Sequence, residues 1–232
     1  MRARDARSTY GWWSMAFKSM LRVTLGPVLA IMVALAANVA PAAAEPYRIV
    51  GFGDSLMAGY ELGAGEGFPA RLEAALKARG HDVAVADAGV SGDTSSGGLS
   101  RLDWSVPDGT DLVILELGAN DMLRGIAPEL TESNLDRMIS RLKDRGIAVL
   151  LAGMVAAPNL GPDYAKAFNA IYPRLAAKHD VPLVAFFLEG VAANRKLQLA
   201  DGMHPNAAGV EAMVENALPA LERIIGAAPA DG

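Results

Sequence analysis

The sequence predicts an α/β fold in three layers, with a parallel five-stranded sheet between two layers of helices. Two observations indicate this class. From Pro46 onward, short β-branched or apolar runs alternate with segments whose apolar residues recur at helical spacing, as in repeated βαβ units. Two of the apolar runs are nearly continuous, which is typical of strands that a parallel sheet buries on both faces. With 232 residues, of which 52% are hydrophobic, the chain is expected to form one domain around a single core.

Five segments are expected to form the strands. In chain order they are residues 47–52, 82–87, 111–117, 147–153 and 182–187. The third and fourth are the nearly continuous apolar runs and are expected to lie centrally. Apolar residues at helical spacing are found in residues 68–76, 135–142, 164–179 and 205–225, and the second of these helices is expected to end at Gly146.

Residues 1–44 have the composition of an export signal. Five Lys and Arg residues precede an uncharged run over residues 23–44, which ends in three alanines before Glu45. Basic residues, an apolar run and then small residues are the order of a cleaved signal peptide. A retained membrane anchor is the alternative, because the run is just long enough to span a bilayer, although Pro27, Asn38 and Pro41 weaken it. Translation from Met15 or Met20 is a further alternative.

The rest of the chain is acidic and lacks cysteine. Without residues 1–44 it has 16 Lys and Arg against 25 Asp and Glu, a net charge of −9, which repels nucleic acid. The absence of cysteine excludes a disulfide framework and a thiolate metal site, and it is compatible with an oxidising compartment. We expect a periplasmic or secreted domain at residues 45–226 and a frayed tail at 227–232. Membrane contact is expected only through the N-terminal segment, if that segment is not cleaved.

Ser55 directly follows the first predicted strand, in the run Gly53-Asp54-Ser55-Leu56. In an open, doubly wound sheet, ligands bind beyond the carboxyl ends of the strands, so chemistry is expected in the segments that follow them. A serine where a strand turns sharply into a helix exposes its hydroxyl near free amides, and it becomes a nucleophile when a base takes its proton. The alternative is that Ser55 only caps the helix.

The next two strands are also followed by candidate groups. Gly92 lies in the run of residues 88–94, where the backbone can approach a ligand closely, although a tight turn before a short helix is the alternative. Asn120 lies in the run of residues 116–121, and its amide can donate a hydrogen bond to a developing oxyanion. Asn is also a common turn residue.

Asp201 precedes His204 by three residues, in a loop that opens the last predicted helix. A carboxylate this close can orient an imidazole and stabilise its protonated form. The other two histidines are weaker candidates, because His81 lies in a polar turn and His179 ends a helix. The acids that follow the strands, together with His204, are residue types that can bind a divalent metal ion. None of these residues has tight ligand spacing, so no metal is expected.

Together the four blocks resemble those of the SGNH (GDSL) hydrolase superfamily. The blocks are residues 53–56, Gly92, residues 118–121 and residues 201–204. The resemblance covers nearly all of the chain after residue 44. It is nearest to bacterial periplasmic acyl hydrolases described as arylesterase, acyl thioesterase and lysophospholipase, through residues 91–94, 116–125, 170–173 and 181–183. It implies a flavodoxin-like fold, and the one departure, Ala119 where close relatives often have glycine, adds only a methyl group.

The resemblance implies the roles of the site residues. Ser55 would be the nucleophile, His204 the general base and then acid, and Asp201 the residue that orients His204. The backbone amides of Ser55 and Gly92 and the side chain of Asn120 would form the oxyanion hole. No cofactor is implied.

The expected substrate is a small acyl ester or thioester. Its acyl or aryl group is expected to contact apolar residues in the loops at 59–67, 122–128 and 154–163. The candidates for this contact are Leu62, Met122, Leu123, Met154 and Leu160. Two other functions stay open at this point: an esterase that removes acetyl groups from polysaccharides, and a non-catalytic binding module with the same fold.

Overall fold

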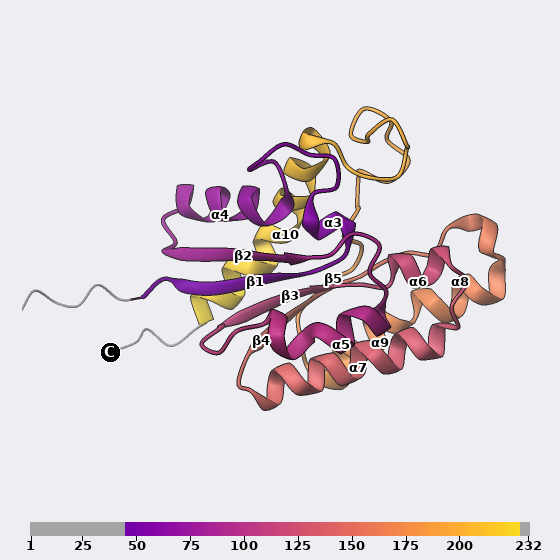
Figure 1. The fold of residues 1–232 in the computed structure, drawn as a ribbon, viewed down its shortest axis with the longest axis horizontal. Coiled ribbons are helices and arrows are strands. Elements are labelled where there is room, and N and C mark those ends of the chain that lie inside the picture. The colour runs from indigo at the N-terminus through magenta and orange to yellow at the C-terminus, as the bar shows by residue number, and fades with distance from the viewer. Residues whose placement is uncertain (1–44, 228–232) are drawn as a thin grey trace, which may run out of the picture. The chain divides into compact units, whose positions relative to one another are not determined.

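Residues 45–227 are the part of the chain that the computed structural model describes (Figure 1). The predicted signal peptide at residues 1–44 lies outside the described residues, as does the predicted tail apart from Ala227. Within the described part, no helix combines the length and the apolar character that a membrane crossing requires.

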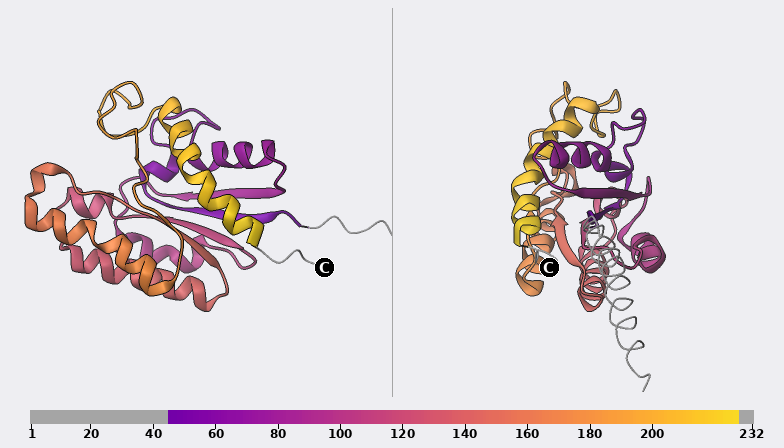
Figure 2. Two further views of the ribbon diagram at one scale, coloured as in Figure 1. Left: turned by 180° about the vertical axis from the view of Figure 1, so that it is seen from behind. Right: turned by 90° about the vertical axis from the view of Figure 1, so that its left-hand side faces the viewer.

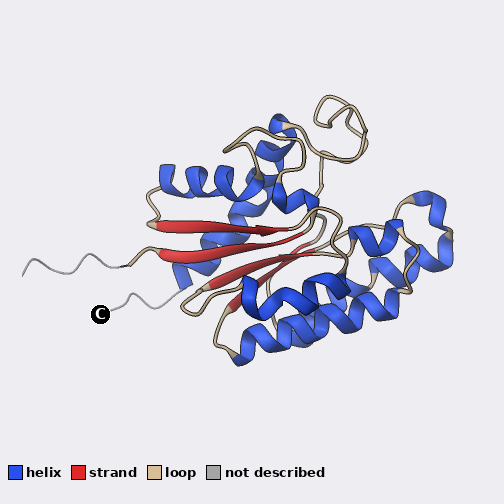
Figure 3. Cartoon of the chain, in the orientation of Figure 1, coloured by secondary structure: helices blue, strands red, loops and turns tan. Residues whose placement is uncertain are grey.

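A single sheet of five parallel strands runs through the described residues (Figure 3). The strands are β1 (Tyr47–Gly53), β2 (Val83–Gly89), β3 (Leu112–Glu116), β4 (Ala148–Ala152) and β5 (Leu183–Val184). Their order across the sheet is β2-β1-β3-β4-β5, so β3 is the middle strand and β4 has a neighbour on each side. The predicted parallel sheet is therefore confirmed, and both apolar runs lie inside it.

Helices cover both faces of this sheet (Figures 1 and 2). On one face α4 (Phe68–Ala78) packs against α10 (Ala207–Ala227), and on the other α7 (Pro128–Asp144) packs against both α5 (Ser95–Ser105) and α9 (Ile171–His179). The remaining helices are shorter and follow strands: α3 (Ser55–Ala58) after β1, α6 (Ala119–Leu123) after β3, and the 3-10 turn η1 (Pro158–Leu160) and α8 (Pro162–Asn169) after β4. The three-layer α/β/α prediction is confirmed.

The helix predicted at residues 164–179 is in fact two helices, α8 and α9, which meet at Ala170. Pro173 gives the physical reason. It has no N–H to donate to the carbonyl of Asn169, four residues earlier, so the helical hydrogen bonding is interrupted there.

The fifth strand is shorter than predicted, because regular pairing ends at Val184. The chain continues beside β4, with Gly153 donating its N–H to the Val184 carbonyl (2.8 Å) and accepting from the Phe187 N–H (2.8 Å). Since this is the edge of the sheet, no further strand requires the segment to stay extended.

Helix α5 is longer than the short helix considered from the sequence. Its apolar residues are few because serine and glycine occupy many of its positions, so their helical spacing is hard to recognise. Gly98 is needed for packing, since a Cβ at this position would lie 2.2 Å from Leu117 Cδ1. The helix can therefore lie close to the chain that leaves β3.

The strand order also sets where a site can form. In a sheet of this order the direction of winding reverses between β1 and β3, which opens a crevice beyond their carboxyl ends. Ser55 follows β1 and Asn120 follows β3, so the topology brings these two candidate residues to the same crevice.

Candidate active site

Ser55 is the first residue of α3, but it is not the cap of that helix. Asp54 is the N-cap, and its carboxylate accepts a hydrogen bond from the Leu56 N–H at 3.1 Å. The Ser55 hydroxyl is therefore not used to cap the helix, and its backbone N–H is one of the unpaired amides of a helix N-terminus. The capping alternative weighed from the sequence applies to Asp54 instead.

His204 joins Ser55 to Asp201. Its Nε2 lies 3.0 Å from Ser55 Oγ, and its Nδ1 lies 2.5 Å from Asp201 Oδ2. The other Asp201 oxygen accepts the backbone N–H groups of Met203 (2.8 Å) and His204 (3.1 Å). The hydrogen bond from His204 and the one from the Met203 N–H lower the pKa of Asp201 to about 2, so this carboxylate is ionised at neutral pH.

The loop that holds His204 is fixed by backbone contacts. Gln198 and Pro205 form an antiparallel bridge, and the Leu199 N–H donates to the His204 carbonyl at 2.8 Å. The ring of Tyr60 covers the imidazole, with ring centroids 4.4 Å apart. Tyr60 was not a candidate from the sequence, because an aromatic residue five positions after a nucleophile carries no recognisable signal.

Asn120 has its side-chain orientation set by Asp54. Its Nδ2 donates to Asp54 Oδ2 at 2.9 Å, which leaves the second N–H of that amide for another acceptor. Gly92 has a φ of +82°, a conformation that favours glycine, and its carbonyl accepts from Arg124 Nη2 at 2.7 Å. Ser55, Gly92, Asn120 and His204 all line the same cavity.

Two fully buried carboxyl groups lie beneath the nucleophile turn. Glu116 accepts the Asp54 N–H at 3.1 Å, and neither side chain has any solvent exposure. Burial, together with the charge of Asp54, raises the pKa of Glu116 well above its ordinary value. Burial also raises the pKa of Asp54, but the Leu56 and Asn120 donors oppose that shift. Glu116 is therefore the carboxyl of this pair that is expected to keep its proton to higher pH.

Asp121, the neighbour of Asn120, anchors α6 from the other side. Its carboxylate accepts from the Ser95 N–H (2.7 Å), the Ser95 hydroxyl (2.5 Å) and the Thr131 hydroxyl (3.1 Å). Asp121 is fully buried, so these bonds hold α6 against α5 and α7. The sequence placed Asp121 in a motif but gave no sign of these partners.

The cavity beside Ser55 has a volume of about 760 Å³ and a mainly apolar lining. Of the five predicted substrate contacts, Met122, Leu123 and Met154 line it. Leu62 and Leu160 do not line it, so these two predictions are corrected. Both side chains are half-buried and pack against the hydrophobic core, because their loops fold back onto the domain. Val155, from the same predicted loop as Met154, also lines the cavity, and larger lining residues that the sequence did not single out include Tyr60, Phe186, Leu188 and Met203.

The other two histidines are partly buried and do not line this cavity. His179 Nε2 contacts Asp136 at 2.6 Å, and His81 lies 3.8 Å from Glu222. Over residues 45–227, no group of three or more acidic or histidine side chains has an arrangement that could hold a metal ion.

Comparison with known proteins gives one family and several close relatives. The family described as GDSL-like lipase/acylhydrolase matches residues 52–212. Esterase TesA of Pseudomonas aeruginosa is 40% identical over 79% of this chain and 91% of that protein. An arylesterase of Vibrio mimicus is 43% identical over 68% and 80%. Thioesterase 1/protease 1/lysophospholipase L1 of Escherichia coli K12 is 40% identical over 71% and 77%.

Solved structures agree with these relatives. A crystal structure of TesA matches with a TM-score of 0.73 and 40% identity, covering 76% of this chain and 99% of that one. AlinE4, an SGNH-hydrolase family esterase, matches with a TM-score of 0.67 and 46% identity, covering 78% and 98%. The fold class inferred from the sequence is thereby confirmed.

The raised pKa of Glu116 predicts how Glu116→Gln changes stability with pH. A carboxyl whose folded pKa is raised stabilises the protein less as pH rises, because the unfolded chain releases the proton first. Above the ordinary pKa of 4.5, the native protein should lose stability relative to the variant by up to about 1.4 kcal/mol per pH unit. Urea unfolding between pH 5 and 8 measures this difference. The exposed Glu129→Gln is the matched control, and a pH-independent difference for Glu116→Gln contradicts the assignment.

Proposed function

This chain belongs to the GDSL-like lipase/acylhydrolase family, and we propose that it hydrolyses acyl esters through Ser55, His204 and Asp201. The activity class follows from the family and its relatives: the chain is a carboxylic ester hydrolase. One observation carries the residue assignment. A continuous line of contacts joins the Ser55 hydroxyl, the imidazole and an ionised carboxylate at the side of an apolar cavity.

The reaction begins with attack of Ser55 Oγ on the acyl carbonyl, while His204 Nε2 takes the hydroxyl proton. Asp201 holds the Nδ1–H side of the ring and stabilises the imidazolium that forms. The tetrahedral intermediate collapses when His204 returns the proton to the leaving alcohol or thiol. Water then attacks the acyl enzyme with the same base, which restores the serine.

The negative charge of the intermediate is received by three donors in our proposal. They are the backbone N–H groups of Ser55 and Gly92 and the free side-chain N–H of Asn120. Asp54 supports this role of Asn120, because a carboxylate accepts hydrogen bonds but does not donate them, and so pairs with the Nδ2 of Asn120 rather than with its amide oxygen. Donors held in place before the reaction lower the barrier without reorganisation.

The cavity lining supports an acyl chain or aryl group as the part of the substrate that binds there. Its walls include Met122, Met154 and Phe186, and exposed apolar side chains, Leu123 and Met203 among them, also contribute to its lining. The names of the relatives point to aryl esters, thioesters and lysophospholipids as substrates to test. Such a lining suits these better than the polar, open cleft expected of a polysaccharide acetyl esterase.

We propose further that residues 1–44 direct export and that the catalytic domain spans residues 45–226. The support is the order of basic, apolar and small residues in the sequence. The exported protein is expected to begin near Glu45, and Edman sequencing of the protein recovered outside the cytoplasm checks this. A mature chain that begins before Val23 contradicts cleavage.

Replacing Ser55 or Asn120 tests the catalytic assignment. Ser55→Ala should lower kcat by at least about 10⁴-fold, because no other group on the line of contacts can attack the carbonyl. Asn120→Ala should lower kcat by roughly 100-fold, because one oxyanion donor is lost.

p-Nitrophenyl ester hydrolysis gives the rates, and labelling by a fluorophosphonate probe should disappear in Ser55→Ala. The assignment is wrong if Ser55→Ala keeps near-native turnover. If the native chain is neither labelled by the probe nor hydrolyses any ester, the chain is a non-catalytic module.

Leu123→Glu tests whether the cavity binds the acyl chain. Leu123 lines the cavity and is 53% exposed, so the change should be tolerated by the fold. It should lower kcat/KM for p-nitrophenyl decanoate by about tenfold, equivalent to losing contact with roughly two methylenes, and leave the acetate ester nearly unchanged. Leu130→Glu is the matched control, since Leu130 is 48% exposed on α7 and is not part of the cavity lining. Equal effects on both esters, or equal effects of both variants, would show that the chain binds elsewhere.

A further inference from the structure

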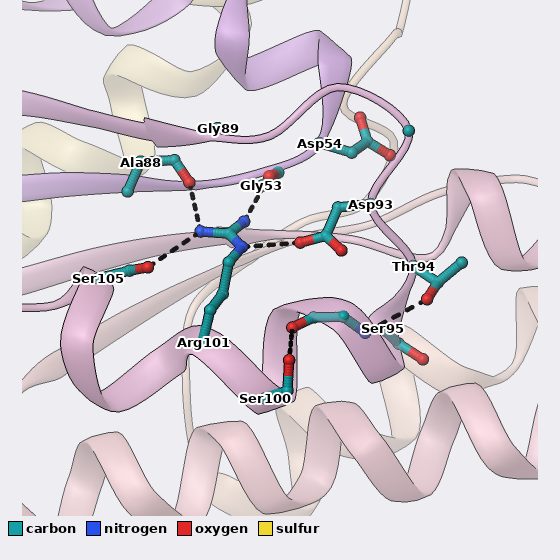
Figure 4. A network of polar contacts seen from close by, with 12 residues as sticks. Gly53, Asp54, Ala88, Gly89, Asp93, Thr94, Ser95, Ser100, Arg101 and Ser105 are labelled. Carbon is teal, nitrogen blue, oxygen red and sulfur yellow. Dashed lines mark hydrogen bonds and ion pairs between the residues drawn. The ribbon is translucent and has the colours of Figure 1, made fainter.

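Arg101 is a charged side chain buried at the carboxyl edge of the sheet, with only 6% exposure. Figure 4 shows it reaching from α5 to the ends of β1 and β2. Nη2 donates to the Gly53 carbonyl (2.8 Å), and Nη1 donates to the Ala88 carbonyl (2.8 Å) and the Ser105 hydroxyl (3.3 Å). Nε donates to Asp93 Oδ2 at 2.7 Å. One guanidinium therefore contacts both strand ends and the loop that follows β2.

The Gly53 carbonyl is shared between Arg101 and that loop. It accepts from the Val90 N–H at 3.0 Å as well as from Arg101. Gly53 precedes the Asp54–Ser55 turn, so a displacement of this peptide also displaces the first residues of α3. The nucleophile turn and the start of the second loop are thus tied to the same carbonyl oxygen.

Asp93 ties the far end of the loop to Arg101, and it is the residue directly after Gly92. Its carboxylate lies against the backbone of α5, where a Cβ on Gly97 would be 1.8 Å from Oδ1. Thr94 then caps α5 by accepting the Gly97 N–H at 3.3 Å. Gly92 therefore lies between two residues that are linked to Arg101. Asp93 is bonded to Arg101 directly, and Val90 shares the Gly53 carbonyl oxygen with it.

The value of this arrangement is not stability alone. A buried ion pair recovers little more than the cost of removing its charges from water, so apolar residues would hold the same elements together at least as well. Apolar contacts, however, have no preferred direction and so do not fix the angles between the groups that they join. The planar fork of arginine donates at set angles to several acceptors at once, and Arg101 Cζ lies over the Phe52 ring, 4.0 Å from its centroid.

We propose that Arg101 is a positioning residue of the oxyanion hole. By holding the Gly53 carbonyl and the Asp93 carboxylate together, it sets the spacing between the backbone amides of Ser55 and Gly92. This inference rests on the proposed function, because it takes these two amides as donors to the tetrahedral intermediate.

Arg101→Lys is the first test, since lysine keeps the charge but donates from a single nitrogen. We expect kcat to fall by roughly 10- to 100-fold with KM within about twofold, because a small displacement of a donor acts on the transition state more than on substrate binding. The rate of phosphonylation by a fluorophosphonate probe should fall by a similar factor. Asp93→Asn keeps the size of the side chain and should change both rates in the same direction, to a smaller extent.

Arg145→Lys is the matched control. Arg145 also donates to a main-chain carbonyl and a carboxylate, those of Val106 (2.7 Å) and Asp108 (3.2 Å). Both residues precede β3, so these contacts lie at the amino ends of the strands, away from the site. It should lower the melting temperature and leave kcat within about twofold of native. All rates are measured well below the melting temperature of each variant, so that loss of folded protein does not contribute.

The inference is overturned if Arg101→Lys and Asp93→Asn are folded and keep native kcat, or if only KM changes. Should Arg101→Lys fail to fold, Asp93→Asn decides alone, by the same criteria. Failure of the proposed function looks different, because Ser55→Ala would then retain turnover. If Ser55→Ala is inactive and Asn120→Ala impaired while the Asp93 and Arg101 variants are native, only the role of Arg101 falls.

Discussion

The carboxylate of Asp54 accepts hydrogen bonds from two segments of the site that are far apart in the chain. Leu56 donates from the first turn of α3, and Asn120, which lies 66 residues after Asp54, donates from α6. The first bond frees Ser55 from capping the helix, and the second orients the Asn120 amide. Both bonds end on a carboxyl that is buried away from water, and the raised pKa of Glu116 beneath it limits the negative charge in this place. Without a proton on Glu116, two negative charges would share this buried volume.

Three carboxyl groups of the site are thus set to different states by their surroundings. Asp201, at the surface and bonded to His204, is held ionised, and its pKa is lowered to about 2. Glu116 has no solvent exposure, and burial and the charge of Asp54 raise its pKa well above its ordinary value. Asp54 lies between these extremes, because its donors oppose the effect of burial. Such separation of identical groups by environment is how a single site keeps one acid charged and another protonated at the same pH.

The site has a polar floor and apolar walls, and different parts of the fold supply them. Buried Asp54, Glu116, Arg101 and Asp121 lie at the ends of strands or on the helices that follow, where the sheet holds them rigidly. The cavity walls come from loops, including those that carry Leu123, Met154 and Met203. In the proposed mechanism, the geometry of the catalytic groups therefore depends on the sheet, and substrate preference depends on loops that can vary without disturbing the sheet.

The sequence by itself predicted the layer architecture and the positions of the strands, and it singled out Ser55, Gly92, Asn120, Asp201 and His204 as candidates, because periodicity and short motifs are local properties of the chain. Only the tertiary structure decided that Tyr60 covers His204, that Leu62 and Leu160 pack on the core rather than line the cavity, and that Pro173 divides one helix into two. It also decided the burial and the partners of Glu116 and Arg101. From the sequence alone, an acid or an arginine is expected to lie at the surface. Its burial and its partners come from packing between segments that are far apart in the chain, and no local pattern indicates which segments meet.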